Sequence, residues 1–273
     1  MPERTISARG VKLAVSADGT GDPVVLLHGL TASRRYVIMG SRALARAGHR
    51  VVACDARGHG ASTPAPSPEA YGYDQLVADL VAVLDELRIE RAVFAGASMG
   101  AHTIVRLALE LPERVAGAVL ITPGYDPVEI EGDGRLARWD ALAAALRADG
   151  IEGFVSASQL DRLPEAWRAT VATVMRQRLA RHEHLDAVAD ALRVVPRSRP
   201  FEDLHALEQV ECPAVVVGSR DEADPGHPLA LAEAYAELLP HGRLALEEEG
   251  QPPLAWQGGQ LSKIIAELAR EAA

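Results

Sequence analysis

The chain has 273 residues, enough for one large α/β domain or for such a domain with an insertion. Its 48% hydrophobic and 24% charged residues are typical of a soluble globular protein. With 28 basic and 38 acidic residues the formal net charge is −10, so no basic surplus exists to bind nucleic acids or anionic membranes.

The cysteines and the N-terminal residues indicate the compartment. Cys54 and Cys212 lack metal-ligand spacing and form no disulfide framework, so both are expected to be reduced. The first residues contain no apolar segment typical of a secretion signal, and the apolar runs are too short to span a membrane. We therefore expect a cytoplasmic protein.

Strand patterns alternate with helix patterns in the first half of the chain. After a β-hairpin over residues 3–20, strands are expected over residues 24–27, 50–54, 92–97 and 115–121. Helices are expected between them over residues 33–47 and 73–87 and from residue 99 onward. Gly48 is expected to close the first of these helices.

Residues 126–200 interrupt the alternation, because they contain helix patterns without a good strand. These patterns cover residues 136–148, 153–160, 164–182 and 183–194. We predict that residues 126–200 form a helical cap and that residues 1–125 and 201–273 form the core domain. The candidates for lining a substrate pocket under the cap are Trp139, Phe154, Trp167 and Met175. The alternative is that these side chains only anchor the cap helices.

The alternation resumes after the predicted cap. Strands over residues 214–217 and 243–246 flank a helix over residues 228–239, and a last helix is expected over residues 261–270. This order predicts an α/β fold with a mostly parallel central sheet and helices on both faces. In such sheets ligands bind beyond the carboxyl ends of the strands.

The motif Gly96-Ala97-Ser98-Met99-Gly100 lies between a predicted strand and a predicted helix. A serine on such a turn points its hydroxyl away from the sheet, and the glycines leave room for the helix to start close to the strand. The N-terminus of that helix offers N–H groups to a developing oxyanion. The pattern therefore predicts a nucleophilic serine.

Two further motifs follow the first two buried strands, namely His28-Gly29-Leu30-Thr31 and Asp55-Ala56-Arg57-Gly58-His59-Gly60-Ala61-Ser62. In order and spacing the three motifs resemble the α/β-hydrolase family, and the resemblance extends from about Val11 to the final helix. It implies the α/β-hydrolase fold, with Ser98 as the nucleophile and the backbone N–H groups of Leu30 and Met99 as the oxyanion hole. It implies structural roles in the loops for His28, Asp55, Arg57 and His59.

The same resemblance implies an acid three residues after Gly218, which selects Asp221. Asp224 is the alternative acid, although its position before Pro225 favours a turn residue. The family's histidine follows the last strand, where this chain has Gln251. Glutamine has no titrating group and cannot take the serine proton, and loss of the base from a Ser–His unit costs roughly 10⁶ in kcat in a protease.

Three explanations of Gln251 stay open. Another histidine can act as the base, either His227 in the loop after Asp221 or His102 one helical turn beyond Ser98. The chemistry can instead need no base or use the substrate as one, with Gln251 binding a ligand or water. Gln251 can also be an engineered change that traps a substrate, or a natural decay into a binding protein.

We therefore expect a serine hydrolase that acts on a small carboxylic ester, thioester or lactone. The alternatives are a hydrolase-like protein that binds a ligand without turnover and a lyase or cyclase. Epoxide hydrolases and haloalkane dehalogenases are disfavoured, because they use an aspartate where this chain has Ser98. The sequence contains no phosphate-binding loop, metal-ligand spacing or dinucleotide motif, so neither a cofactor nor a metal is expected.

Overall fold

The computed structural model describes residues 3–130, 134–220 and 224–272. Within these residues eight strands form one sheet in the order β1-β2-β4-β3-β5-β6-β7-β8. The first two strand pairs in this order are antiparallel and all the others are parallel. The strands are β1 (Glu3–Ala8), β2 (Val11–Asp18), β3 (Pro23–Leu27), β4 (Arg50–Cys54), β5 (Ala92–Ala97), β6 (Val115–Ile121), β7 (Ala214–Val217) and β8 (Gly242–Ala245).

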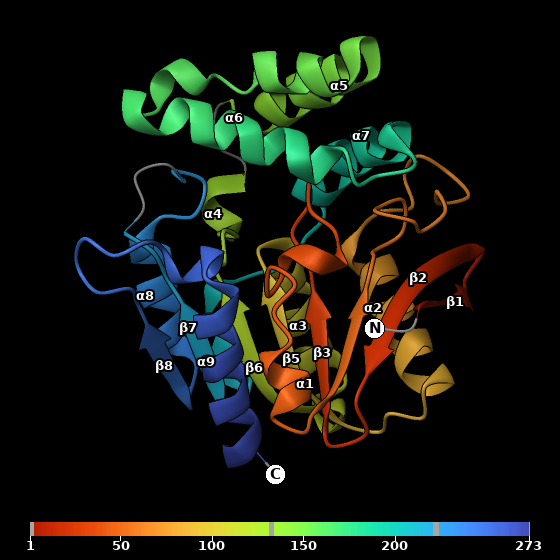
Figure 1. Cartoon of the computed structure of the whole chain (residues 1–273), viewed down its shortest axis with the longest axis vertical. Coiled ribbons are helices and arrows are strands. Elements are labelled where there is room, and N and C mark those ends of the chain that lie inside the picture. Colours follow the sequence, from red (N-terminus) through yellow and green to blue (C-terminus); the bar gives the residue numbers. More distant parts are fainter. Residues whose placement is uncertain (1–2, 131–133, 221–223, 273) are drawn as a thin grey trace.

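Helices cover both faces of this sheet (Figure 1). One face packs against α2 (Tyr73–Glu86), α3 (Met99–Glu110) and α8 (Leu229–Leu238). The other packs against α1 (Ala43–Arg46) and α9 (Gly258–Glu271). The central strands read as continuous apolar runs because both of their faces are buried, as in β3, where Val24, Val25 and Leu26 are fully buried. The predicted α/β fold with a mostly parallel sheet is confirmed.

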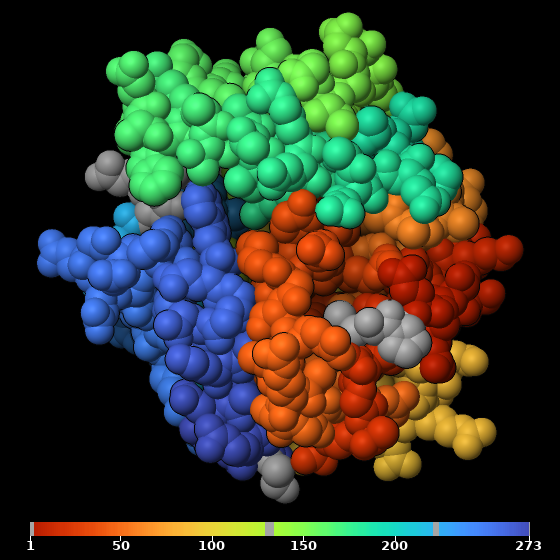
Figure 2. Space-filling model, in the orientation of Figure 1, coloured from red at the N-terminus to blue at the C-terminus, as the bar shows by residue number. Residues whose placement is uncertain are grey.

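The described residues between β6 and β7 contain helices and no strand. They form α4 (Pro127–Ile130), α5 (Arg135–Ala157), α6 (Glu165–Leu179) and α7 (Leu185–Val194). Figure 1 shows α5, α6 and α7 beyond the ends to which the arrows of β3 and β6 point. In Figure 2 the same segment, in green and teal, covers that end of the molecule above a narrow recess. The boundaries of this cap at residues 126 and 200 stay a prediction.

Two helix predictions differ from the structure. The helix expected over residues 33–47 is interrupted, because Met39 and Gly40 have positive φ angles of 48° and 74°. Only the short 3-10 helix η1 (Arg34–Tyr36) and α1 remain of it. The helices expected over residues 136–148 and 153–160 instead form one element, α5, with a kink at Gly150 where φ is 62° and ψ is −145°.

Candidate active site

Ser98 lies on a sharp turn between β5 and α3. Its φ of 48° and ψ of −111° are rare for a residue with a side chain, and such strained geometry recurs at active sites. The turn is held on both sides, since the Ser98 N–H donates to the Ile121 carbonyl and the Ser98 carbonyl accepts from the His102 N–H. The hydroxyl is thereby fixed at the carboxyl end of the sheet.

The glycines that flank Ser98 have a steric cause. A Cβ on Gly96 would lie 2.5 Å from the carbonyl carbon of Gly100. A Cβ on Gly100 would overlap the carbonyl group of Leu27 in β3. Because backbone meets backbone at both positions, a side chain at either one would push α3 away from the sheet and move Ser98 with it.

His227 is the histidine that reaches Ser98. Its Nε2 lies 2.9 Å from Ser98 Oγ, and its Nδ1 lies 2.8 Å from Asp224 Oδ2. Asp224 and His227 belong to one turn between β7 and α8, in which the His227 N–H also donates to the Asp224 carbonyl. The structure thus brings together a hydroxyl, an imidazole and a carboxylate in the order that a serine nucleophile and its base require.

The carboxylate in this chain of contacts is held in its charged form. Burial raises the pKa of Asp224, but the charge of His227 and its hydrogen bond, together with the charge of Arg178 and the Gly226 N–H, hold that pKa below its usual value. Arg178 comes from α6, and its guanidinium carbon lies 5.9 Å from the centre of the Tyr36 ring. A cation from the cap therefore supports the ionised carboxylate.

Neighbouring residues fix the loop that carries Asp224 and His227. At its start the Arg220 N–H donates to Oε1 of the buried Glu247 at 2.5 Å, and the Arg220 guanidinium donates to the Glu247 carbonyl. Near its end the His227 ring packs against Gly124, where an added Cβ would lie 2.7 Å from His227 Cδ2. The imidazole therefore has little room to move away from Ser98.

Leu30 and Met99, the predicted oxyanion residues, flank Ser98. A Cβ added to Gly29, the neighbour of Leu30, would lie 3.6 Å from Ser98 Cβ. Met99 directly follows Ser98 at the start of α3. The backbone N–H groups of Leu30 and Met99 make no hydrogen bond within the described residues. Two N–H donors are therefore available beside the serine hydroxyl.

His102, the other candidate base, has both ring nitrogens engaged elsewhere. Its Nε2 accepts from the Gly124 N–H at 3.0 Å, so Nδ1 carries the proton and donates to the Tyr73 hydroxyl at 2.9 Å. Burial, with a contribution from His227, lowers the pKa of His102 to about 3. The structure thus shows a neutral histidine that supports Gly124 beneath the site.

Gln251 and Asp221 are the residues that the sequence places at the histidine and acid positions of the triad. Gln251 is exposed in the loop between β8 and α9, where its N–H donates to the Glu248 carbonyl. Within the described residues its side chain makes no hydrogen bond with Ser98. Asp221 lies outside the described residues, so the structure describes Asp224 alone of the two candidate acids.

The four predicted pocket residues divide into two groups. Phe154 is buried in an apolar cluster that contains Leu30 and Met99, and the partly buried Trp139 and Met175 pack against the same cluster. Trp167 is 37% exposed, and its ring meets that of Trp256 edge to face at 6.3 Å. Three of the four therefore gather on the cap side of the oxyanion residues, and the fourth contacts the loop after β8.

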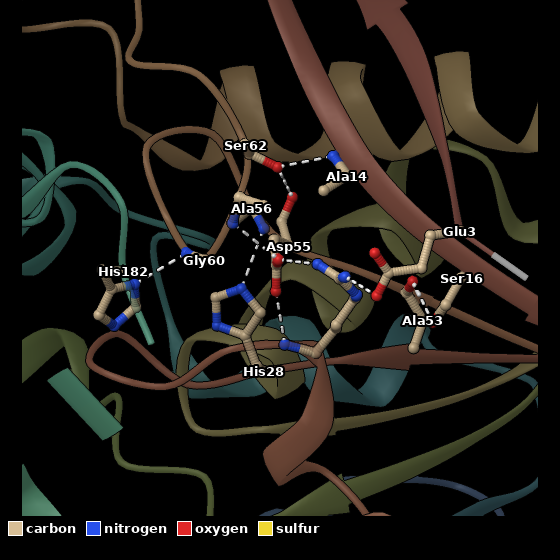
Figure 3. Close-up of polar contacts among 12 residues, drawn as sticks. Glu3, Ala14, Ser16, His28, Ala53, Asp55, Ala56, Gly60, Ser62 and His182 are labelled. Carbon is tan, nitrogen blue, oxygen red and sulfur yellow. Dashed lines mark hydrogen bonds and ion pairs between the residues drawn. The ribbon is translucent and has the colours of Figure 1, made fainter. Parts of the chain in front are cut away.

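The polar residues in the loop motifs have structural partners, as Arg57, Asp55 and His28 show. Arg57 is buried and makes a bidentate ion pair with Asp79 at 2.7 and 2.8 Å. The carboxylate of Asp55 accepts from the N–H groups of Arg34 and Ala61, and Figure 3 shows it at the centre of the polar contacts that are drawn. His28 Nε2 accepts from the Ala56 N–H.

The described residues contain neither a candidate membrane span nor a candidate metal site. No helix in these parts of the chain combines the length and apolar character needed to cross a membrane. No group of three or more His, Cys, Asp and Glu side chains among them is arranged to hold a metal ion.

Comparisons with known sequences show the family of this chain. A model of the alpha/beta hydrolase fold family matches residues 22–250. The putative carbamate hydrolase RutD of Variovorax paradoxus is 31% identical over 240 residues, which cover 84% of this chain and 86% of that protein. The putative non-heme haloperoxidase of Mycobacterium phage D29 is 43% identical over 120 residues, but these cover only 44% of this chain and 42% of that protein.

Solved structures show the same fold at lower identity. A thermophilic esterase from Thermogutta terrifontis has a TM-score of 0.81 at 23% identity, with 100% of this chain and 99% of that chain covered. The enol-lactonase from Burkholderia xenovorans LB400 has a TM-score of 0.78 at 21% identity, with 97% and 99% covered. At these identities the likeness concerns the fold.

Proposed function

This chain belongs to the α/β-hydrolase fold family, and we propose that it is a serine hydrolase for small carboxylic esters, thioesters or lactones. The observation that carries the proposal is the 2.9 Å contact between Ser98 Oγ and His227 Nε2, with His227 Nδ1 bound to Asp224. A proton on Nδ1, held by the carboxylate, leaves the Nε2 lone pair free to accept the serine proton.

The proposed reaction has two halves. Ser98 Oγ attacks the acyl carbon while its proton passes to His227 Nε2, and the N–H groups of Leu30 and Met99 stabilise the tetrahedral oxyanion. When the tetrahedral intermediate collapses, the bond to the leaving group breaks and His227 returns the proton to the departing alcohol or thiol. Water then attacks the acyl-serine with the same proton transfers, which releases the acid and restores Ser98.

The names of the similar proteins support an acyl substrate. Three of the four reported above, although not the haloperoxidase, are named as a carbamate hydrolase, an esterase and a lactonase, and carbamates, esters and lactones share an acyl carbon bonded to a leaving atom. The apolar cluster with Phe154, Trp139 and Met175 beside the oxyanion residues favours a small, partly apolar acyl group. Binding without turnover and lyase or cyclase chemistry are the alternatives that an experiment must exclude.

Turnover of p-nitrophenyl esters, acyl thioesters and lactones tests the proposal. We expect the wild-type chain to hydrolyse at least one of these classes, and Ser98→Ala and His227→Ala to lower kcat by roughly 10⁶, the loss seen in a serine protease. A fluorophosphonate should label the wild-type chain and leave Ser98→Ala unlabelled. Turnover that survives in Ser98→Ala, or the absence of both turnover and labelling in the wild type, would refute the proposal.

A further inference from the structure

The turn that carries Leu30 is bound by three histidines. Each of three successive carbonyl groups in this turn lies within hydrogen-bond distance of a different imidazole. The contacts are His28 Nδ1 to Gly29 O at 2.8 Å, His59 Nε2 to Leu30 O at 2.7 Å and His182 Nε2 to Thr31 O at 3.1 Å. All three histidines are buried, and His59 lies 5.2 Å from His28 and 5.5 Å from His182 between ring centres.

His182 is the member of this group that comes from the cap. It lies between α6 and α7, whereas His28 follows β3 and His59 lies in the loop after β4. Its Nδ1 accepts from the Gly60 N–H at 2.8 Å, so its Nε2 carries the proton and donates to Thr31 O. Both nitrogens of this neutral ring are therefore hydrogen-bonded, Nδ1 to the loop that contains Gly60 and Nε2 to the turn that contains Thr31. Figure 3 shows the ring pointing to Gly60.

A second contact strengthens the bond between the cap and Gly60. The N–H of Glu183, next to His182, donates to the Gly60 carbonyl at 2.9 Å, so the cap holds both backbone groups of Gly60. Gly60 has a φ of 52° and lies so close to Asp55 that a Cβ would overlap that carboxylate. Asp55 Oδ1 in turn accepts from the Arg34 N–H at 2.7 Å, and Arg34 lies at the far end of the turn that carries Leu30.

We propose that His182 is a positioning residue for the oxyanion hole, which couples the cap to the Leu30 N–H donor. The inference rests on the proposed function. One ring from the cap holds the carbonyl that follows Leu30 and, through Gly60 and Asp55, supports the other end of the same turn. Oxyanion donors must be held within about 0.5 Å of their productive geometry, and loss of one donor costs roughly 10²–10³ in kcat.

Two amide variants separate the two hydrogen bonds of His182. The amide nitrogen of glutamine can reach the position of Nε2, so His182→Gln can keep the donor to Thr31 O. The amide of asparagine can reach only the position of Nδ1, so His182→Asn can keep the acceptor for the Gly60 N–H alone. The matched control is His205→Asn, because His205 is exposed and its ring contacts only Glu208 in the described residues.

The readouts are kcat, KM, the thermal midpoint and the affinity for a trifluoromethyl ketone, which adds to a serine as a tetrahedral oxyanion. We expect His182→Asn to lower kcat and ketone affinity by about ten- to a hundredfold with little change in KM. His182→Gln should keep most of both, and His205→Asn should match the wild type. If His182→Ala fails to fold, the Gln and Asn variants still decide the question.

Three outcomes would overturn the inference. One is a wild-type kcat in a folded His182→Asn variant, and the second is an equal loss in the Gln and Asn variants, which would indicate packing alone. In both of these cases Ser98→Ala still abolishes turnover, so the proposed function stands. The third is a wild-type chain without turnover that depends on Ser98, which would reject the proposed function and this inference together.

Discussion

Gly124 leaves the space that the His227 ring occupies. A Cβ on Gly124 would lie 2.7 Å from His227 Cδ2 and 3.2 Å from Nε2, the atom that faces Ser98. Because a Cβ does not approach another heavy atom that closely, Gly124→Ala must displace the imidazole. We expect kcat to fall by roughly 10², the cost of a displacement of about 1 Å, with little change in KM.

Gly259→Ala is the control for this substitution. Gly259 lies in α9, and a Cβ there meets no atom within 4 Å. Steady-state kinetics with the same ester should show wild-type behaviour for Gly259→Ala. Equal activity of Gly124→Ala and the wild type would mean that the position of His227 does not limit the reaction.

Gln251 should be dispensable if His227 is the base. Because Gln251 is exposed and makes no hydrogen bond with Ser98 in the described residues, Gln251→Ala is expected to leave kcat unchanged. Gln251→His should give no gain for the same reason. A large loss in Gln251→Ala, measured on the best ester, would support the explanation in which Gln251 binds a ligand or water.

The two candidate acids can be separated by isosteric changes. Asp224→Asn removes the charge that faces His227 Nδ1, and in serine proteases the equivalent change lowers kcat by about 10⁴. Asp221→Asn is expected to keep most of the activity. The measurement is kcat/KM as a function of pH for both variants. A larger loss of activity in Asp221→Asn than in Asp224→Asn would assign the acid to Asp221.

The sheet and the serine turn could be predicted because their signals are local. Buried strands such as β3 read as apolar runs, and the spacing of Gly96 and Gly100 around Ser98 reflects close contacts between backbones. The interruption of the helix over residues 33–47 was missed because a single glycine such as Gly40 is tolerated in many helices, and the residue type of Met39 does not indicate a positive φ.

The contact between His227 and Ser98 could not be predicted from the sequence, for a different reason. The two residues are 129 positions apart, so their distance depends on how the loop after β7 folds against Gly124 and Glu247. Asp224, followed by proline and glycine, suits an ordinary turn, and the structure does contain that turn. From the sequence, His227 could therefore be named only as an alternative base and Asp224 only as an alternative acid.

The buried histidines predict how stability depends on pH. Burial is the largest cause that lowers the pKa of His28, His102 and His182, each from 6.5 to about 3. Below pH 6.5 the unfolded chain therefore binds protons that the folded chain does not, and stability is lost as the pH falls toward 3. Three such groups give a slope of up to about 4 kcal/mol per pH unit.

Urea unfolding between pH 7 and pH 5 measures this slope above the range in which carboxylates titrate. The free energy of unfolding should fall steadily over that interval. In His182→Gln this slope should be smaller by up to about 1.4 kcal/mol per pH unit, the contribution of one proton, whatever that change does to stability at pH 7. A flat profile in the wild type would contradict the prediction.

The ion pair of Arg57 and Asp79 predicts a large stability effect. Both side chains are buried, so Asp79→Ala leaves an unpaired guanidinium inside the protein, which costs about 3–5 kcal/mol. Asp85 lies in the same helix and pairs with Arg114 at the surface, so Asp85→Ala should cost less than about 1 kcal/mol. Urea unfolding at pH 7 compares the two variants, and similar losses would contradict the argument.

Asp224 and His227 come from a stretch of four residues, Asp224-Pro225-Gly226-His227. With the proposed roles, one short loop supplies both partners of the nucleophile, and their mutual geometry survives any shift of that loop as a whole. The segment after β8 then supplies no proton acceptor, and its Glu247 holds Arg220 at the start of that loop. Exchange of that loop would move the acid and the base together, into a scaffold that carries the serine and leaves the space that Gly124 leaves here.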